Sequence, residues 1–216
     1  MKDKSRYETT DMIDARIEPG SGGRVLKNLP GIKRKREMDQ VEGQEQRRAL
    51  DELIRTYDKD HRFTSADVRK IHKLWLGKIY AWAGSYRSID LGKGGFWFAN
   101  AKQISKLMDD LERGPLRRFT PCTFTSRDRV VHAIAVVHVE LVLIHPFREG
   151  NGRLARMLAI LMGLQAGLPL LDFGSIKGKK KKAYFAAVQA GMERNYLPME
   201  KIFSDVIDRT LRLCDR

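Results

Sequence analysis

The stretch "VVHAIAVVHVELVLIHPFREGNGRLARMLAILMGLQAGL" (residues 130–168) places a dense polar cluster between two long apolar segments. Pro146 disfavours the α conformation at the residue before it, so the first apolar segment is predicted to form a helix that stops near Ile144. Helical spacing resumes at about Gly152 or Arg153. Residues 145–152 are therefore predicted to be a short connection that leads into a helix N-terminus.

The polar cluster has features that suit a phosphorylated ligand. A helix N-terminus presents unpaired N–H groups to an anion, and the glycines at 150 and 152 permit a phosphate to come close. Gly150 and Asn151 also suit the backbone that a concave nest of N–H groups needs. Arg153 and Arg156 are three residues apart, so they project from one side of the helix and favour a polyphosphate over a single phosphate.

Two further side chains add chemistry to this cluster. Glu149 is a hard oxygen ligand of the kind that a phosphate-bridging Mg²⁺ prefers. His145 can gain and lose a proton near neutral pH. Each residue alone has an ordinary interpretation, because a histidine often caps or packs a helix end, paired arginines often form a solvated face and glycines often form turns. Their occurrence together favours a catalytic or binding site.

The rest of the chain is predicted to be mostly α-helical. The spacing of apolar residues predicts further helices over residues 38–57, 63–84, 101–114, 179–194 and 198–213. In "YRSIDLGKGGFWFAN" (residues 86–100), β-forming residues flank a glycine-rich turn, which predicts a short hairpin. Residues 1–23 include "EPGSGG" and are predicted to be a flexible arm. The expected fold is a helical bundle with one short β-hairpin.

Composition narrows the class of protein and of partner. The 216 residues carry 41 Lys and Arg against 27 Asp and Glu, and this net charge of +14 favours polyanions such as nucleotides, nucleic acid or an acidic protein. Two cysteines make no disulfide framework, and the charged N-terminus has no apolar signal-peptide core. A cytoplasmic protein without a membrane span is expected. "GSIKGKKKK" (residues 174–182) lacks P-loop spacing and is not assigned to phosphate binding.

The motif at residues 145–156 resembles the signature of the Fic family, HPFx[D/E]GNGRxxR, at every specified position. "WAGSYRSIDLGKGGFWF" (residues 82–98) resembles the WAG-x-YR segment and hairpin flap of that family, and "VLKNLPGI" (residues 25–32) resembles the start of its core. The resemblance implies a Fic-type helical domain over residues 24–216. It also implies a protein adenylyltransferase, which transfers AMP from ATP to a Ser, Thr or Tyr hydroxyl of a target protein and releases pyrophosphate.

Residue roles follow from the same resemblance. It implies that His145 is the general base, that Glu149 binds Mg²⁺ and that Phe147 anchors the loop in the core. The predicted nucleotide-binding residues are Arg148, Glu149, Gly150, Asn151, Gly152, Arg153 and Arg156. The flap is implied to dock the target as an added strand, and its predicted contacts are Ile89, Leu91, Lys93, Gly94 and Phe96. The aromatic residues at 96–98 have the alternative role of packing on the bundle.

The sequence matches an inhibitory motif of the Fic family only in part. Many Fic proteins are restrained by a helix with [S/T]xxxE[G/N], whose glutamate pairs with the second motif arginine. Glu42 followed by Gly43 partly matches that pattern, but Met38 stands where Ser or Thr belongs. Glu42 is thus an inhibitory candidate or an ordinary exposed helical residue, and a separate antitoxin-like protein is the alternative inhibitor.

Two other functions remain open at this stage. One is a Fic enzyme that removes AMP or transfers another nucleotide or a phosphate group, although Gly152 argues against the phosphotransferase branch, which usually has lysine there. The other is a basic nucleic-acid-binding module, which the clusters "KRKR" and "KGKKKK" favour.

Overall fold

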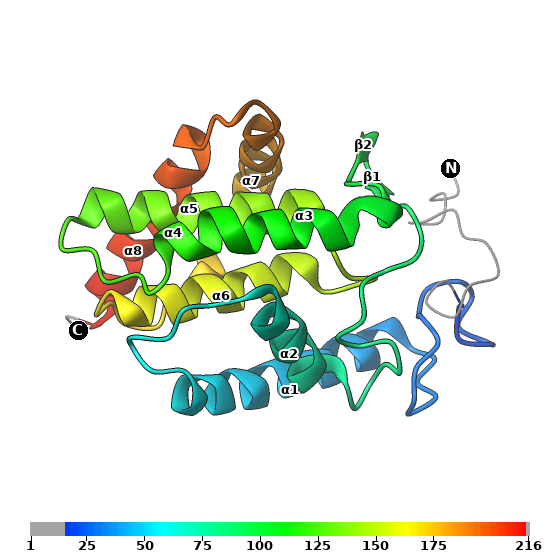
Figure 1. Ribbon diagram of the computed structural model, residues 1–216. Coiled ribbons are helices and arrows are strands. Elements are labelled where there is room, and N and C mark those ends of the chain that lie inside the picture. The colour runs from blue at the N-terminus through cyan, green and yellow to red at the C-terminus, as the bar shows by residue number, and fades with distance from the viewer. Residues whose placement is uncertain (1–15, 215–216) are drawn as a thin grey trace.

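Two apolar helices, α5 (Arg127–Ile144) and α6 (Asn151–Gln165), lie side by side at the centre of the molecule and run in opposite directions (Figure 1). The computed structural model describes residues 16–214, except for the side chain of Lys179. Most of α5 is buried, since it packs against α3, α6, α7 and α8. This explains why residues 130–144 are apolar on nearly every face rather than along one stripe.

The other elements surround this pair. The bounds are α1 (Lys35–Thr56), α2 (Ser65–Leu76), β1 (Gly92–Lys93), β2 (Phe96–Trp97), η2 (Ala101–Gln103), α3 (Ile104–Leu111), η3 (Glu112–Leu116), α4 (Arg117–Phe119), η4 (Phe173–Ser175), α7 (Lys179–Ala190), η5 (Gly191–Glu193) and α8 (Leu197–Cys214). The helices α1 and α2 pack on each other and on α6, whereas α7 and α8 cover the other side of α5. Within the described residues the only sheet is the antiparallel pair β1–β2, so the predicted mostly α fold with one hairpin is confirmed.

The two largest differences between predicted and observed helix boundaries lie at the ends of α2 and α3. The helix expected over residues 63–84 ends at Leu76, and residues 77–84 form turns. Gly84 has φ +83°, and a Cβ there would lie 2.9 Å from the Lys73 side chain, so this turn packs closely on α2. The helix expected to stop at residue 114 continues as η3 and α4 to Phe119.

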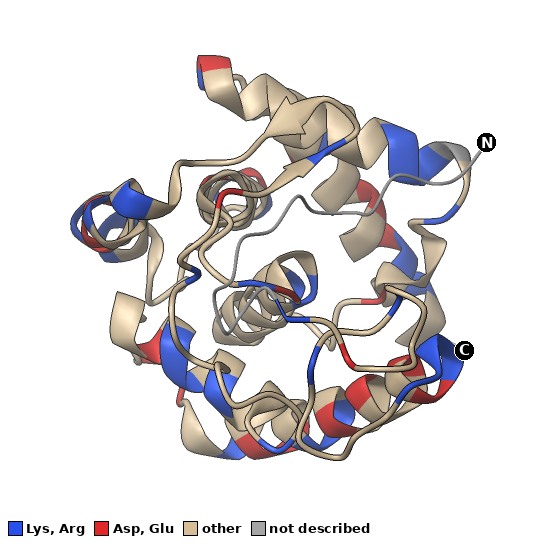
Figure 2. Ribbon diagram, turned by 90° about the vertical axis from the view of Figure 1, so that its right-hand side faces the viewer, with Lys and Arg blue, Asp and Glu red and all other residues tan. Residues whose placement is uncertain are grey.

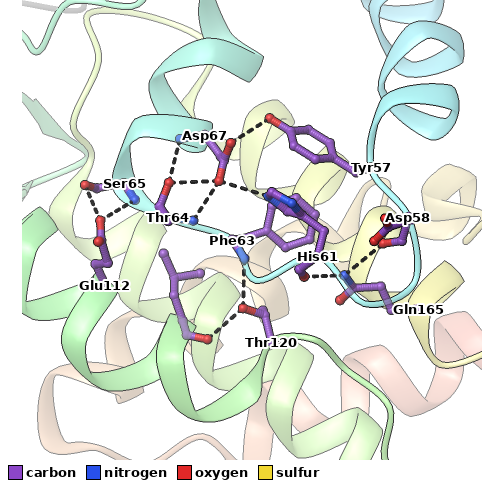
Figure 3. Close-up of polar contacts among 11 residues, drawn as sticks. Tyr57, Asp58, His61, Phe63, Thr64, Ser65, Asp67, Glu112, Thr120 and Gln165 are labelled. Atoms are coloured by element: carbon purple, nitrogen blue, oxygen red, sulfur yellow. Dashed lines mark hydrogen bonds and ion pairs between the residues drawn. The ribbon is translucent and has the colours of Figure 1, made fainter.

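A polar network fixes the start of α2 (Figure 3). Thr64 and Asp67 form a capping box, in which each side chain accepts a hydrogen bond from the other's backbone N–H. The N–H and hydroxyl of Ser65 both donate to Glu112, at 2.7 and 2.6 Å, and Gln165 at the end of α6 donates to a carbonyl of the loop before α2. These contacts fix α2 against its neighbours, and α2 carries two side chains that support the site described below.

The predicted arm at residues 1–23 is only partly within the described residues, because residues 1–15 lie outside them. Residues 16–23 fold back on the next segment. Ile17 forms a β-bridge with Leu26, and the Glu18 carboxylate accepts hydrogen bonds from the backbone and side chain of Asn28. In residues 16–214 we find no helix with both the length and the apolar character that a bilayer crossing requires.

Candidate active site

The motif loop connects α5 to α6 at the end of the molecule that also carries β1 and β2 (Figure 1). The α5 helix ends at Ile144, and His145 follows in the left-handed conformation with φ +51°. Gly150, with φ +84°, is the N-cap of α6. The predicted short connection between two buried helices is therefore present, and α6 begins one residue earlier than expected.

The His145 imidazole is held in one orientation and one protonation state. Its Nδ1 lies 3.1 Å from the carbonyl of Val142, which can only accept, so Nδ1 carries the hydrogen and the Nε2 lone pair is available. The ring stacks on Phe98 with 3.6 Å between centroids. Burial lowers the pKa of His145 to about 4, against the opposing effect of the hydrogen bond to Val142. The imidazole is thus neutral at pH 7 and able to accept a proton at Nε2.

The two motif arginines differ in their partners. Arg153 donates to Glu42 at 2.6 Å and to Glu149 at 3.4 Å, and its guanidinium lies over the Trp75 ring. Burial opposes its charge, yet Glu42 and Glu149 raise the pKa of Arg153 above its usual value. Arg156 is half-buried and makes no hydrogen bond or ion pair within residues 16–214, and burial lowers the pKa of its guanidinium.

The start of α6 offers unpaired N–H groups to an anion. The first intrahelical bond runs from Leu154 to the carbonyl of Gly150, and no side chain of residues 16–214 caps this end. A Cβ on Gly150 would lie 2.8 Å from Trp75, so this glycine is required by packing. A Cβ on Gly152 would meet no atom of the described residues within 4 Å, so these residues leave the side of the helix at Gly152 open to a ligand.

Three motif residues lie inside the loop. Asn151 closes it, because its Oδ1 accepts from the Phe147 N–H at 2.8 Å and its Nδ2 donates to the Phe147 carbonyl at 2.7 Å. Phe147 is fully buried, in agreement with a loop anchor, and Arg148 is 1% exposed. In this conformation the side chains of Asn151 and Arg148 face the protein rather than solvent, so a role for them is to support the loop.

Glu149 is the motif's carboxylate. Its side chain is 24% exposed, and its Oε1 accepts from Gly150 at 3.2 Å as well as from Arg153. No cluster of three or more metal-binding side chains occurs in the described part of the chain. A single carboxylate fits a Mg²⁺ that takes its other oxygens from phosphates and water.

Figure 2 faces this end of the molecule and shows Lys and Arg on segments all round it.

The sequence of this chain is similar to those of known proteins. Residues 62–162 match the model of the Fic/DOC family. The chain is 31% identical over 167 residues to the protein adenylyltransferase VbhT of Bartonella schoenbuchensis, covering 75% of this chain and 33% of VbhT. It is 31% identical over 145 residues to the "Probable protein adenylyltransferase Fic" of Escherichia coli, covering 65% of this chain and 68% of that protein. The chain belongs to the Fic/DOC family.

A solved structure agrees with this fold. The crystal structure of BepC from Bartonella tribocorum with bound AMPPNP has a TM-score of 0.74 and 25% identity, and the match covers 91% of this chain and 98% of that one. The predicted family and fold are therefore confirmed. VbhT is about three times as long as the matched region, so its activity is carried to this Fic chain only as a proposal.

His72 is a site residue that the sequence did not reveal. Its Nδ1 accepts from the N–H of Gly84 at 2.8 Å, and its Nε2 lies 3.1 Å from the carbonyl of Glu149. The ring stacks on Phe147 at 3.9 Å. Burial lowers the pKa of His72 to about 4, so it is the neutral tautomer with hydrogen on Nε2. His72 thereby joins the WAG-x-YR segment to the motif loop, through a partner 77 residues away.

The flap (residues 89–99) turns at Gly94 and Gly95, whose φ values are +59° and +82°. Its base is buried, because Ile89 and Leu91 form a small apolar cluster with Phe98. The side chains of Ile89 and Leu91, which were predicted to contact a target, are 6% and 1% exposed and face this cluster. Any contact with a target at these two positions would have to use the backbone.

The tip of the flap is more exposed. Lys93 is exposed and its ammonium lies 4.2 Å from the centre of the Phe185 ring on α7, while Phe96 is half-buried against Phe98. The three aromatic residues at 96–98, for which packing on the bundle was the alternative role, behave differently from one another. Phe98 packs on His145, but Trp97 is 64% exposed. Trp97 joins Lys93 and Gly94 as the accessible part of the flap.

Proposed function

We propose that this Fic chain is an ATP- and Mg²⁺-dependent protein adenylyltransferase that modifies a Ser, Thr or Tyr hydroxyl of a target protein. The observation that carries the proposal is a neutral imidazole, with its Nε2 lone pair available, at the same loop as an uncapped helix N-terminus and two arginines. The names "Protein adenylyltransferase VbhT" and, for the Escherichia coli protein, "Probable protein adenylyltransferase Fic" support the same reaction.

The residues have separate tasks in this reaction. His145 takes the proton of the target hydroxyl at Nε2, and the oxygen forms a bond to the α-phosphorus as the bond to pyrophosphate breaks. The N–H groups at the start of α6, together with Arg153 and Arg156, stabilise the charge on the phosphates. Glu149 is the residue that would hold Mg²⁺, and the ion would neutralise phosphate charge when bound. His72 and Asn151 fix the loop that carries these groups.

The flap is proposed to hold the target. Its strands are short and its tip is exposed, so an extended peptide can pair with its edge through backbone hydrogen bonds. Because the Phe98 ring at the flap base stacks on His145, a peptide bound there would bring its hydroxyl toward the imidazole. Backbone pairing would also explain why side chains such as those of Ile89 and Leu91 can be buried.

Glu42 is proposed to position Arg153 rather than to inhibit the enzyme. It is 2% exposed, which rules out the exposed helical glutamate considered above, and it also accepts a hydrogen bond from Tyr80 at 2.7 Å. Its partner is the first motif arginine, whereas the family's inhibitory glutamate pairs with the second. Arg156, the second arginine, would then be the docking point for a glutamate of a separate small antitoxin-like protein.

A Glu42→Gly variant distinguishes these two roles. If Glu42 positions Arg153, the variant transfers AMP at the wild-type rate or more slowly, because the guanidinium loses its closest acceptor. The rate of label transfer from ATP is the measurement, with folding checked by circular dichroism. A variant more active than wild type would instead support internal inhibition.

The proposed reaction is tested with labelled ATP. Lysate is incubated with the purified chain and with ATP labelled at either the α- or the γ-phosphate. AMP transfer predicts protein-bound label from the α position only, whereas label from γ only would show phosphate transfer and overturn the proposal. No label from either position, with the His145→Ala variant still binding nucleic acid in a salt-sensitive way, would favour the nucleic-acid-binding alternative.

The matched control is His145→Ala. This variant removes the proton acceptor but leaves the arginines and the helix start in place, so transfer is lost while ATP binding is retained.

We also propose a reducing, cytoplasmic location, which the two free thiols support: Cys122 is buried and Cys214 is exposed.

A further inference from the structure

A buried arginine connects the flap to the motif loop. The Arg87 side chain is 0% exposed, yet its guanidinium donates to four backbone carbonyls. Nε donates to His145 at 2.7 Å, Nη1 donates to Ile89 at 2.5 Å, and Nη2 donates to Ala99 and, at 3.4 Å, to Ile144. A buried guanidinium is tolerated because its fork of N–H groups is matched by acceptors in several directions.

Two of these carbonyls belong to the end of α5. Unpaired carbonyls and the negative end of the helix dipole favour a cation at this position. The backbone N–H of Arg87 also donates to the carbonyl of Pro146 at 2.9 Å. Arg87 therefore holds the peptide groups on both sides of His145, the residue whose left-handed backbone directs the imidazole.

The other two carbonyls belong to the two ends of the flap. One precedes β1 and the other follows β2, so a single guanidinium holds both ends together. Asp90 lies 3.9 Å from the guanidinium and accepts a hydrogen bond from Asn100, which closes the base further. The N–H of Ala99 donates to Leu143 on α5, so the flap is also fixed to the helix directly.

We propose that Arg87 is a positioning residue that sets the distance and angle between a flap-bound target and the His145 imidazole. The inference rests on the proposed function, because it assumes that the flap holds the target and that His145 accepts the proton. Arg87 itself is buried and contacts neither reactant. Lysine would be a poor substitute, since one ammonium on a flexible stem cannot reach acceptors at both the helix end and the two flap ends.

The test compares Arg87→Lys with a matched control, Arg69→Lys. Arg69 also donates to a backbone carbonyl, that of Gly84 in the WAG-x-YR segment, at 2.9 Å. Arg69 contacts neither the flap nor His145. For Arg87→Lys we expect AMP transfer to fall by about 100-fold, the loss that a misplaced reacting group can cause. ATP affinity, measured by calorimetry, is expected to stay within roughly three-fold of wild type, because Arg153, Arg156 and the helix start are unchanged. Arg69→Lys is expected to resemble wild type in both measurements.

An independent readout separates this inference from the proposed function. The NMR resonances of the His145 imidazole are expected to shift in Arg87→Lys and not in Arg69→Lys, whether or not the wild type transfers AMP. An absence of AMP transfer in wild type would defeat the proposed function, whereas unshifted His145 resonances would defeat the positioning role. Equal losses of ATP affinity and transfer would also overturn it. Arg87→Gln serves as a second variant, and loss of fold in both variants would assign Arg87 a structural role instead.

Discussion

At the scale of single residues, the two glycines of the motif are present for different reasons. Gly150 combines a positive φ with close contact to Trp75, so the fold itself demands it. Gly152 lies in the first turn of α6, where nothing in the described chain occupies the space beside it. The fold alone would accept a side chain at Gly152, and the proposed phosphate would not.

This contrast gives a paired prediction. Gly150→Ala is expected to lower the free energy of unfolding by about 1–3 kcal/mol, through backbone strain and the clash with Trp75. Gly152→Ala is expected to leave stability unchanged or raise it by up to about 1 kcal/mol, because alanine is the better helix former, but to weaken ATP binding. Thermal unfolding and calorimetry with ATP measure the two effects. Wild-type affinity in Gly152→Ala would mean that the phosphates lie elsewhere.

Residue-level prediction worked where the chemistry is local in the chain. Pro146 and the glycines define the ends of the helices around the loop within a few residues, and the structure agrees. Glu42 could not be placed in this way. It lies 111 residues from Arg153 along the chain, and only packing of α1 against α2 and α6 brings the two together.

At the scale of elements, α2 positions the motif loop from outside it. His72 and Trp75 lie on this helix. His72 forms a hydrogen bond with the loop backbone, whereas the Trp75 ring packs against Arg153 and leaves no room for a side chain at Gly150. Neither residue carried a signal beyond helical spacing, because a buried histidine on an apolar helix face is ordinarily a core residue. The role of His72 depends on the tertiary fold, which brings the turn at Gly84 to one ring nitrogen and the motif loop to the other.

We predict that His72→Phe destabilises the chain and reduces AMP transfer. The variant keeps an aromatic ring against Phe147, but it leaves the Gly84 N–H and the Glu149 carbonyl without their partner, at about 1–3 kcal/mol for each group. His132→Phe is the control. His132 is 43% exposed and pairs with Glu200 at 2.8 Å, and loss of this surface pair is expected to change stability by less than about 1 kcal/mol. Urea unfolding measures both. Equal stabilities of the two variants would contradict the bridging role of His72.

At the scale of the whole molecule, the buried His72 and His138 and the half-buried His145 make the fold sensitive to acid. Burial lowers the pKa of His72 and His145 to about 4 and that of His138 to about 3. In the unfolded chain these groups titrate near 6.5, so below that pH the unfolded state binds protons that the folded state does not. Their contribution to stability is complete above pH 6.5 and is lost as the pH falls toward 4.

The free energy of unfolding is therefore expected to fall between pH 6.5 and 5, by on the order of 1 kcal/mol per pH unit for each histidine at most. Urea unfolding midpoints at several pH values measure this loss. In His138→Gln, which cannot titrate in this range, the fall with pH is expected to be shallower. A free energy of unfolding that stays constant from pH 6.5 to pH 5 would contradict the prediction that these histidines are neutral in the folded protein.

The global fold was more predictable than the contacts that complete the site. Apolar periodicity predicted the α5–α6 pair and the helices around it, and β-formers flanking a glycine turn predicted the flap. The same pattern could not show that Leu91 faces inward or that Arg87 holds both ends of the flap, because those facts depend on which element lies beneath the hairpin.

The two thiols have a practical consequence. Burial raises the pKa of Cys122 to about 12, which leaves Cys214 as the reactive sulfur. Cys214 ends α8, and Figure 1 places that terminus at the opposite end of the bundle from the flap. A maleimide dye or an immobilisation linker would attach at one defined point, so single-molecule or surface-based recordings of nucleotide and target binding need no cysteine engineering.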